Sequence, residues 1–276
     1  ADERPYLTLL NSVIPRQASL IAQWLGVGFI HGVMNTDNMS IAGETIDYGP
    51  CAFMDSYHPA TVYSSIDHRG RYAYGNQPRI AQWNLSRLAQ SLLPLIDQDR
   101  SKAINQAQAV IDAFAERFEQ AYLDRFRDKL GLLEARTDDA DLVDTLLNTM
   151  AETGADFTNT FRALCDAVDG ADTAVIDQLG NSIAGRNWLG RWRERLTEEM
   201  VKPAARAARM QRANPAVIPR NHRVEAVLKA AVNGDLEPLE DLLRILASPW
   251  DSHPHNLPYR SPPEPHETVH QTFCGT

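Results

Sequence analysis

Three oxygen-bearing side chains lie close together in sequence between residues 31 and 50. Asp37 directly precedes Asn38, and Asp47 follows at the far end of the stretch. Residues 39–41 and 45–46 can form two short strands around a turn at residues 42–44, so the pattern predicts a hairpin that brings Asp47 beside Asn38. Carboxylate and amide oxygens suit magnesium, which binds one or two protein carboxylates and takes its other ligands from water and phosphate. We therefore predict a magnesium site at the end of this hairpin.

The same side chains are also frequent in turns, because Asn and Asp bond their own backbone, but their register matches a catalytic motif. Protein kinases carry H-R-D-L-x-x-x-N followed by D-F-G, in which the Asn and the second Asp hold the metal ions. Here residues 31–38 read HGVMNTDN and residues 46–48 read IDY, close to the variant of aminoglycoside and choline kinases. Val33 replaces the catalytic Asp of kinases and accepts no proton. Asp37 is then the carboxylate of this loop that can act as the base.

Several longer motifs resemble the selenoprotein O family (SelO/YdiU), and the resemblance covers nearly the whole chain. It is carried by HGVMNTDN, TIDYGP, GRYAYGNQP, QWNL, NPAVIPRNH and the terminal FCGT, most specifically between residues 31 and 95. Members of this family resemble protein kinases but transfer AMP instead of phosphate, because ATP lies flipped in their cleft. The resemblance implies that Asp37 accepts the proton, that Asn38 and Asp47 bind magnesium or manganese, and that Asp47 also faces the nucleotide phosphates.

The resemblance also implies an activity and its partners. The expected enzyme is a nucleotidyltransferase that moves AMP from ATP to Ser, Thr or Tyr hydroxyls of other proteins, with a divalent cation as cofactor. Two alternatives remain open from the residues alone. A kinase-like phosphotransferase would transfer the γ-phosphate of ATP, and a non-catalytic pseudokinase would bind protein partners as a scaffold without needing the cation.

Two cysteines are candidates for a redox role that the resemblance suggests. Cys274 lies third from the end of the chain, a position that resembles the one where animal members carry selenocysteine. An exposed thiol in a polar tail can exchange with another thiol when its pKa is favourable. Cys51, close after Asp47, is the expected partner because of its place beside the catalytic loop, and Tyr63 stands where some relatives carry a cysteine.

Composition argues against several other classes of protein. A net charge of −9 and a pI near 5.4 argue against a nucleic-acid partner, which normally requires a basic face. No apolar run approaches the length of a membrane span, and no signal peptide opens the chain. Three scattered cysteines do not make a disulfide framework, so we expect a cytoplasmic protein.

The start of the sequence suggests a piece of a longer protein. It opens with ADERPYLTLLNS, without an initiator Met, and it contains neither GxGxxG nor GxxxxGK, the loops that hold nucleotide phosphates. Members of the resembled family carry such contacts upstream. We therefore expect this chain to be the C-terminal part of the enzyme, without its N-terminal nucleotide-binding half, and to be inactive in isolation.

Hydrophobic periodicity predicts a mainly α-helical fold. Apolar residues recur at helical spacing over residues 16–30, 77–95, 100–130, 138–150, 156–168, 186–210 and 224–247, the last range broken into two helices at residues 233–234. The charges of residues 186–210 favour a paired, exposed helix. With the hairpin, this pattern predicts a protein-kinase-like C-lobe that carries a small β-hairpin at its catalytic loop and extra C-terminal helices.

We expect three regions along the chain. Residues 1–130 would form the kinase-like C-lobe, including an activation-like segment after residue 50 that is rich in Tyr, Ser, Pro and Gly. Residues 131–247 would form a helical extension, and residues 248–276 a Pro- and His-rich tail with the terminal Cys. The polar residues 220–222 (Arg-Asn-His) either cap the following helix or reach the catalytic face, and the capping role is preferred.

Overall fold

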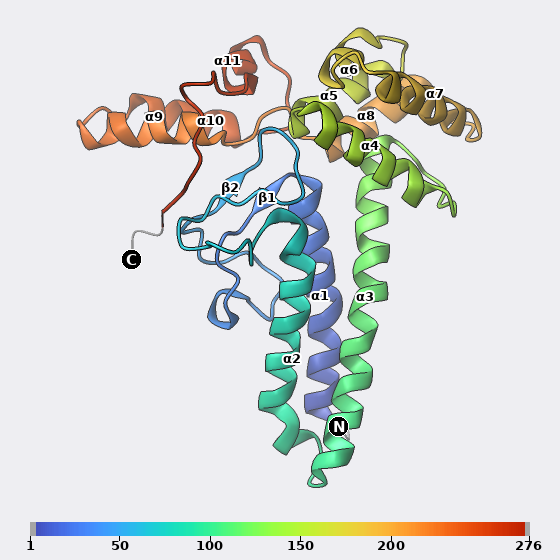
Figure 1. Cartoon of the computed structure of the whole chain (residues 1–276), viewed down its shortest axis with the longest axis vertical. Helices are drawn as coiled ribbons and strands as arrows, with labels where there is room; N and C mark the ends of the chain where they lie inside the picture. Colours follow the sequence, from blue (N-terminus) through green and yellow to red (C-terminus); the bar gives the residue numbers. More distant parts are fainter. Residues whose placement is uncertain (1–3, 274–276) are drawn as a thin grey trace.

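Three long helices lie side by side and form the body of the protein (Figure 1). The computed structural model describes residues 4–273. The three helices are α1 (Pro5–Gly26), α2 (Gln77–Ile96) and α3 (Arg100–Leu130). Asp99 caps α3, because its side chain accepts hydrogen bonds from two backbone N–H groups of the first turn. Gly131 ends α3 with a left-handed φ of 73°, a conformation that favours glycine.

The facing sides of these helices form the hydrophobic core. Apolar residues at intervals of three and four turn one side of α1 toward α3, and α2 packs against both. Fully buried members include Leu10, Ile14 and Ile21 from α1 and Phe114 and Phe126 from α3. The segment between α1 and α2, which holds the candidate site, is therefore anchored at both ends in a packed helical frame.

The segment between α1 and α2 folds back on itself twice. Two short strands pair antiparallel here, β1 (Phe29–Ile30) and β2 (Ala52–Phe53). Phe29 lies opposite Phe53, and further out a single antiparallel bridge joins Met39 to Thr45. The predicted chain reversal is confirmed, although one residue pair forms it where the sequence suggested two short strands. We call residues 29–53 the catalytic ribbon.

A layer of shorter helices crosses one end of the three-helix body (Figure 1). Its members are α4 (Asp139–Thr153), α5 (Phe157–Ala167), α6 (Thr173–Gln178), α7 (Ile183–Thr197), α8 (Pro203–Ala213), α9 (Asn221–Val232), α10 (Glu237–Leu246) and α11 (Leu257–Arg260). The fold is mainly α-helical, as predicted. Between residues 4 and 273, no helix has both the length and the apolar character needed to cross a membrane.

Two predicted helices have other limits in the structure. The helix predicted over residues 16–30 begins at Pro5 and ends at Gly26, and Gly28 then adopts a left-handed φ of 73° that leads into β1. The helix predicted over residues 186–210 is divided into α7 and α8, and Pro203 opens the second. The predicted pairing is confirmed by Arg195 and Glu199, which lie 3.0 Å apart. The predicted exposure holds for one side of the region only, since Trp188 and Trp192 are 1% and 0% exposed.

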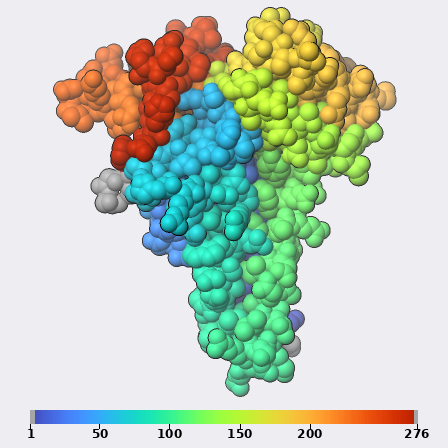
Figure 2. Space-filling view, in the orientation of Figure 1, coloured from blue at the N-terminus to red at the C-terminus, as the bar shows by residue number. Residues whose placement is uncertain are grey.

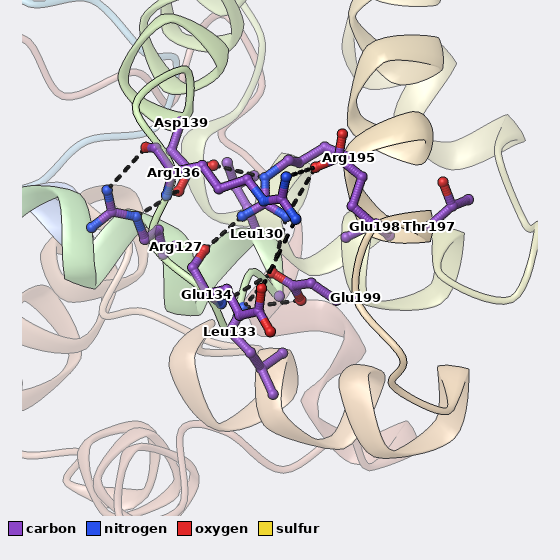
Figure 3. A network of polar contacts seen from close by, with 12 residues as sticks. Arg127, Leu130, Leu133, Glu134, Arg136, Asp139, Arg195, Thr197, Glu198 and Glu199 are labelled. Atoms are coloured by element: carbon purple, nitrogen blue, oxygen red, sulfur yellow. Dashed lines mark hydrogen bonds and ion pairs between the residues drawn. The ribbon is translucent and has the colours of Figure 1, made fainter.

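Charged residues of α7 belong to a buried network (Figure 3). Arg195 donates to Asp139 at 2.9 Å and to Glu199 at 3.0 Å, and Arg127 donates to the second carboxylate oxygen of Asp139 at 2.7 Å. Arg206 donates to Glu199 at 2.9 Å. Because charges are buried at acceptable cost when they are paired and hydrogen-bonded, the network fixes the end of α3 against α4 and α7.

The C-terminal tail returns to the loop that follows β2. Thr272 pairs in parallel with Ser64, and its N–H donates to the carbonyl of Tyr63 at 2.7 Å. Its hydroxyl donates to the carbonyl of Pro50 at 2.5 Å. Figure 2 shows the tail, in red, against the blue and cyan segment of the catalytic ribbon and the loop after it. The tail is therefore attached at its far end to the catalytic ribbon and to the loop that follows it.

Candidate active site

His31 joins the two halves of the catalytic ribbon. Its Nε2 lies 2.9 Å from the carbonyl oxygen of Ile46, and its Nδ1 accepts a hydrogen bond from the N–H of Val33 at 3.4 Å. Since a carbonyl only accepts, Nε2 carries the proton of a neutral ring. Burial lowers the pKa of His31, against the opposing effects of the Ile46 hydrogen bond and the Asp47 charge. His31 therefore holds the residue before Asp47 against the start of the catalytic loop.

Two buried side chains of α1 attach the middle of the ribbon to the helical frame. Trp24 donates from Nε1 to the hydroxyl of Thr45 at 2.8 Å. Gln17 donates to the carbonyl of Ser40 at 2.6 Å. Trp24 is 5% exposed and belongs to the core, as its apolar spacing predicted. Side chains of α1 thus hold the residues at and next to the bridge between Met39 and Thr45 by hydrogen bonds.

Polar side chains from α2 and the loop before it attach the first half of the ribbon. Gln77 accepts a hydrogen bond from the N–H of His31 at 3.1 Å and donates one to the carbonyl of Phe29 at 2.9 Å. Asn84 donates to the carbonyl of Met34 at 3.0 Å. The Tyr72 hydroxyl donates to the amide oxygen of Asn35 at 2.7 Å. Sequence reasoning missed these residues, and the available signal was an amide on the buried face of an apolar helix.

Asn38 has its amide nitrogen engaged and its amide oxygen open. Nδ2 donates to the carbonyl of Val33 at 3.1 Å, which sets the orientation of the amide group. No hydrogen bond from the described part of the chain reaches Oδ1, and the side chain is half-buried. An oriented amide oxygen of this kind suits a hard cation.

Asp47 has a strained backbone and an exposed side chain. Its φ of 55° lies in the left-handed region, which residues other than glycine seldom adopt. Such a conformation costs on the order of 1–3 kcal/mol and is concentrated at functional sites. Oδ1 accepts a hydrogen bond from the N–H of Gly49 at 3.4 Å. The other carboxylate oxygen is open, so Asp47 fits the role of a cation or nucleotide ligand.

Asp37 is an exposed carboxylate directly beside Asn38. Both residues belong to the 3-10 helix η1 (Thr36–Asn38). Within residues 4–273, Asp37 forms no ion pair, so its carboxylate is open to solvent. Val33, at the place of the kinase base, is 8% exposed and engaged through its backbone by His31 and Asn38. Val33 therefore contributes packing, and the carboxylate available in this loop is that of Asp37.

The fold-back of the ribbon leads the site residues to one end of it. Met39 pairs with Thr45, so the chain leaves the bridge toward Asn38 on one side and toward Asp47 on the other, in the same direction. The described residues contain no group of three or more His, Cys, Asp or Glu that could hold a metal ion by itself. One carboxylate and one amide fit a cation that takes its remaining ligands from phosphate and water.

Of the two candidate redox cysteines, Cys51 is described and Cys274 lies outside the described residues. Cys51 is a half-buried free thiol next to Pro50. Burial raises the pKa of Cys51 to about 11, so the thiol is protonated at neutral pH and is a weak nucleophile. Thr272, which binds the Pro50 carbonyl, places the described end of the tail against the residue before Cys51.

Arg220 joins the loop after β2 to the helical layer. It is 1% exposed and donates to Asp55 and to Asp156, at 2.6 Å each. Asn221 donates to the carbonyl of Phe53 at 3.0 Å. The preferred interpretation of residues 220–222 as a helix cap is wrong, because α9 begins without a side-chain capping bond. The cluster instead holds the last residue of the catalytic ribbon and the loop that follows it.

Comparisons with known proteins cover nearly the whole chain. A family model described as "Protein adenylyltransferase SelO" matches residues 1–247. The chain is 56% identical over 277 residues to a protein of Rhizobium etli, 57% over 276 residues to one of Rhodopseudomonas palustris, and 54% over 283 residues to one of Methylorubrum extorquens. Each is named "Protein nucleotidyltransferase YdiU", and each match covers 99% of this chain.

The chain spans about half the length of the curated relatives it matches, from 55% to 57% in these three cases. The family model matches from residue 1 onward. The expectation that the chain resembles the C-terminal part of the family is therefore wrong.

Proposed function

Because the chain belongs to the SelO family, we propose that it carries the catalytic loop of a protein adenylyltransferase, which transfers AMP from ATP to Ser, Thr or Tyr hydroxyls of other proteins. The names of the relatives, which are protein nucleotidyltransferases, support a nucleotide-transfer reaction. The observation that carries the proposal is Asp47, an exposed carboxylate held at a left-handed φ by a ribbon that also leads to Asn38.

In this proposal each residue has one task. A divalent cation, magnesium or manganese, would neutralise charge on the phosphates of ATP. Asn38 would bind it through Oδ1, because Nδ2 is held by the Val33 carbonyl, and Asp47 would bind it through its open carboxylate oxygen. Asp37 accepts the proton of the acceptor hydroxyl. The hydroxyl oxygen forms a bond to the α-phosphorus, the bond to the β-phosphate oxygen breaks, and pyrophosphate leaves.

The position of a label decides between this reaction and a phosphotransferase. A protein of the relatives' full length would be incubated with magnesium, acceptor protein and ATP labelled at either the α- or the γ-phosphate. Retention of the α-label together with adenine on the acceptor supports AMP transfer. Retention of the γ-label identifies a kinase, for which Val33 leaves the usual base position without a carboxylate. Retention of neither label, with partner binding unchanged by a chelator, identifies a scaffold.

We also propose that the 276-residue chain alone transfers little AMP. The support is its sequence, which contains no glycine-rich phosphate loop, and its length, about half that of the relatives. The test compares this chain with a protein of the relatives' full length in the same labelling assay. Equal rates of AMP transfer by the two would show that residues 1–276 suffice.

The regional division remains our proposal. Residues 1–130 would be a kinase-like C-lobe, residues 131–247 a helical extension and residues 248–276 a tail. The nested pairing of β1 with β2 and of Met39 with Thr45, in a segment whose sequence resembles the kinase motif, supports the first assignment. The regions are not expected to fold separately, since Arg220 of the second pairs with Asp55 of the first. A superposition of residues 29–53 on a solved kinase C-lobe would test the assignment.

A redox contact between Cys274 and Cys51 is proposed on the position of the tail. Thr272 binds the carbonyl of Pro50, directly before Cys51. With oxidised glutathione as the oxidant, the two thiols would form one disulfide and release two molecules of reduced glutathione. Mass spectrometry of alkylated, unreduced peptides would detect the linkage. A linkage of either cysteine to the buried Cys165 would indicate unfolding instead.

A further inference from the structure

Arginines border the catalytic ribbon on α2 and on the loop before it. Arg79, Trp83 and Arg87 follow at intervals of four residues, so they lie along one face of α2. Arg69 and Arg71 come from the loop that leads to this helix. All five side chains are exposed. We call these five residues the arginine surface.

The arginine surface is arranged around Trp83. The guanidinium carbon of Arg71 lies 4.8 Å from the centre of the Trp83 ring, and that of Arg87 lies 5.2 Å from it. Guanidinium groups are attracted to the face of an aromatic ring and keep their N–H donors available at its edge. Trp83 is 39% exposed, which is unusual for so large an apolar side chain. The stack therefore holds two cations in place before any partner arrives.

These cations have no acidic partner of their own. Among residues 4–273, no ion pair involves Arg69, Arg71, Arg79 or Arg87. The carboxylate of Asp67 in the same loop accepts backbone N–H groups, including those of Arg69 and Arg71, and so shapes the loop. In a chain of net charge −9, a local group of unneutralised arginines indicates a binding partner of negative charge.

Two hollows border the arginine surface, and one of them reaches the catalytic loop. One, of about 460 Å³, is lined by Trp83 and three of the arginines. The other, of about 340 Å³, is mainly apolar and lies between α1, α2 and the ribbon. Its lining includes both Arg87 and Thr36, the residue directly before Asp37. Arg87 of the arginine surface and the residue directly before the proposed base therefore line the same hollow.

We propose that the arginine surface docks an acidic segment of the acceptor protein and thereby brings a nearby hydroxyl to Asp37. Asp and Glu side chains form paired, charge-assisted hydrogen bonds with guanidinium groups, and an apolar neighbour on the same segment fits the 340 Å³ hollow. A short acidic segment meets only the local positive surface, whereas a long polyanion such as nucleic acid also meets the net negative charge of the molecule. The role of Asp37 rests on the proposed function, but the binding of an acidic segment does not.

Binding can be tested without ATP. The probe is a fluorescent peptide with a single Tyr flanked by three Glu on each side, compared with the same peptide containing Gln. The test variant is Arg79→Glu with Arg87→Glu, and the matched control is Arg117→Glu with Arg212→Glu, which reverses the same charge at exposed helix positions elsewhere. Glu in the first turn of α2 suits the helix dipole, so Arg79→Glu leaves the helix intact. Circular dichroism and thermal unfolding check both pairs for folding.

The expected result is a preference for the Glu peptide that weakens with salt. Each exposed charge contact contributes only a fraction of a kcal/mol to about 1 kcal/mol, so reversal of two charges should weaken Glu-peptide binding about tenfold and leave Gln-peptide binding unchanged. Trp83→Ala should give a smaller loss, because the stack no longer holds the guanidinium groups. Equal affinity for the two peptides, or an equal loss in the control pair, would overturn the proposal. So would tighter binding of a single-stranded oligonucleotide or of anionic vesicles through the same arginines.

A second measurement separates this inference from the proposed function. The label-transfer assay is run with the Glu and Gln peptides and the same variants in a protein of the relatives' full length. If AMP is transferred but the charge reversal leaves the preference among peptides unchanged, the docking inference fails and the activity stands. If no AMP is transferred while the binding preference persists, the activity fails and the docking surface stands.

Discussion

At the scale of single residues, the candidate site is made of side chains that the backbone already orients. The amide nitrogen of Asn38 donates to the Val33 carbonyl, and one carboxylate oxygen of Asp47 accepts from the N–H of Gly49. The amide oxygen of Asn38 and the second carboxylate oxygen of Asp47 are left for a ligand. Orientation of this kind reduces the entropy lost on binding, and the left-handed φ of Asp47 is compatible with that role.

Replacement of Asp47 by Asn tests its role as a ligand of the cation. The change keeps the shape of the side chain but removes the charge that attracts a cation. In a protein of the relatives' full length we therefore expect weaker manganese binding and a loss of AMP transfer of about a hundredfold or more. Manganese binding is measured by electron paramagnetic resonance in the presence of ATP. Glu44→Gln, an equal loss of charge at the exposed turn of the ribbon, is the control and should change neither quantity.

His31 makes the stability of the protein depend on pH. Burial lowers the pKa of His31, so below about pH 6.5 the unfolded chain binds a proton that the folded ring resists. Stability is therefore full above that pH and falls as the pH drops, with a slope of at most about 1.4 kcal/mol per pH unit for one group. Urea unfolding between pH 5 and pH 8 measures it.

The His31→Gln variant isolates this contribution. His222, whose pKa is also lowered by burial, still titrates in the variant and gives the remaining slope. The variant should lose part of the pH dependence, and it should also be less stable at pH 8 by about 1–3 kcal/mol if the Ile46 carbonyl is left without a donor. An unchanged slope in His31→Gln would mean that the ring titrates freely in the folded protein.

At the scale of elements, the buried network between α3, α4 and α7 depends on Asp139. Asp139→Asn leaves Arg127 and Arg195 close together with no carboxylate between them, so we expect a loss of about 3–5 kcal/mol in the free energy of unfolding. Asp141→Asn, which breaks the exposed pair with Arg191, is the matched control and should cost at most about 1 kcal/mol. Chemical denaturation measures the free energy of unfolding of both variants. Equal losses would show that the buried ion pairs of Asp139 contribute no more to stability than the exposed pair of Asp141.

The same network predicts a response to acid. Burial alone would raise the pKa of Asp139, but hydrogen bonds from Arg195, the backbone of Arg136 and Arg127 outweigh burial and lower it. The stability from a lowered pKa is present above the unfolded value near 3.9 and is lost as the pH falls through the folded value. Between pH 5 and pH 2, the free energy of unfolding should therefore change less with pH for Asp139→Asn than for the unmodified protein.

The helices and the fold-back could be predicted from the sequence because both are local. Apolar spacing located α2 and α3 within a residue of their observed limits. The motif register likewise indicated that the chain reverses between Asn38 and Asp47. Local spacing carries no information on which charged residues find distant partners, however, so Arg195 and Glu199 were assigned to an exposed face. Arg220 was assigned to a cap for the same reason.

At the scale of the whole molecule, distant segments converge on the loop after β2. Arg220 pairs with Asp55 and Asp156, although the three residues come from separate parts of the chain. Thr272 closes the other side of the loop by binding Pro50 and pairing with Ser64. The loop itself contains little regular structure, so these long-range contacts replace the backbone ladder that a strand or helix would supply. Its order should then depend on the tail.

Removal of the tail tests that dependence. A chain ending at Arg260 lacks Thr272, so the backbone groups of Tyr63 and Ser65 lose their partners. Local opening of the loop then becomes easier, and trypsin should cut after the exposed Arg69 and Arg71 several-fold faster. Cleavage after Lys229, an exposed residue of α9, serves as the internal reference.

A chain ending at Phe273 is the matched control, because it keeps Thr272 and all its contacts with Pro50, Tyr63 and Ser64. It should be cut after Arg69 at the same rate as the 276-residue chain. Thr272→Val removes the hydroxyl bond but keeps both backbone bonds, so its cleavage rate should fall between the two. If all three proteins are cut equally fast, Arg220 and its neighbours alone order the loop, and the contacts of the tail do not contribute to its order.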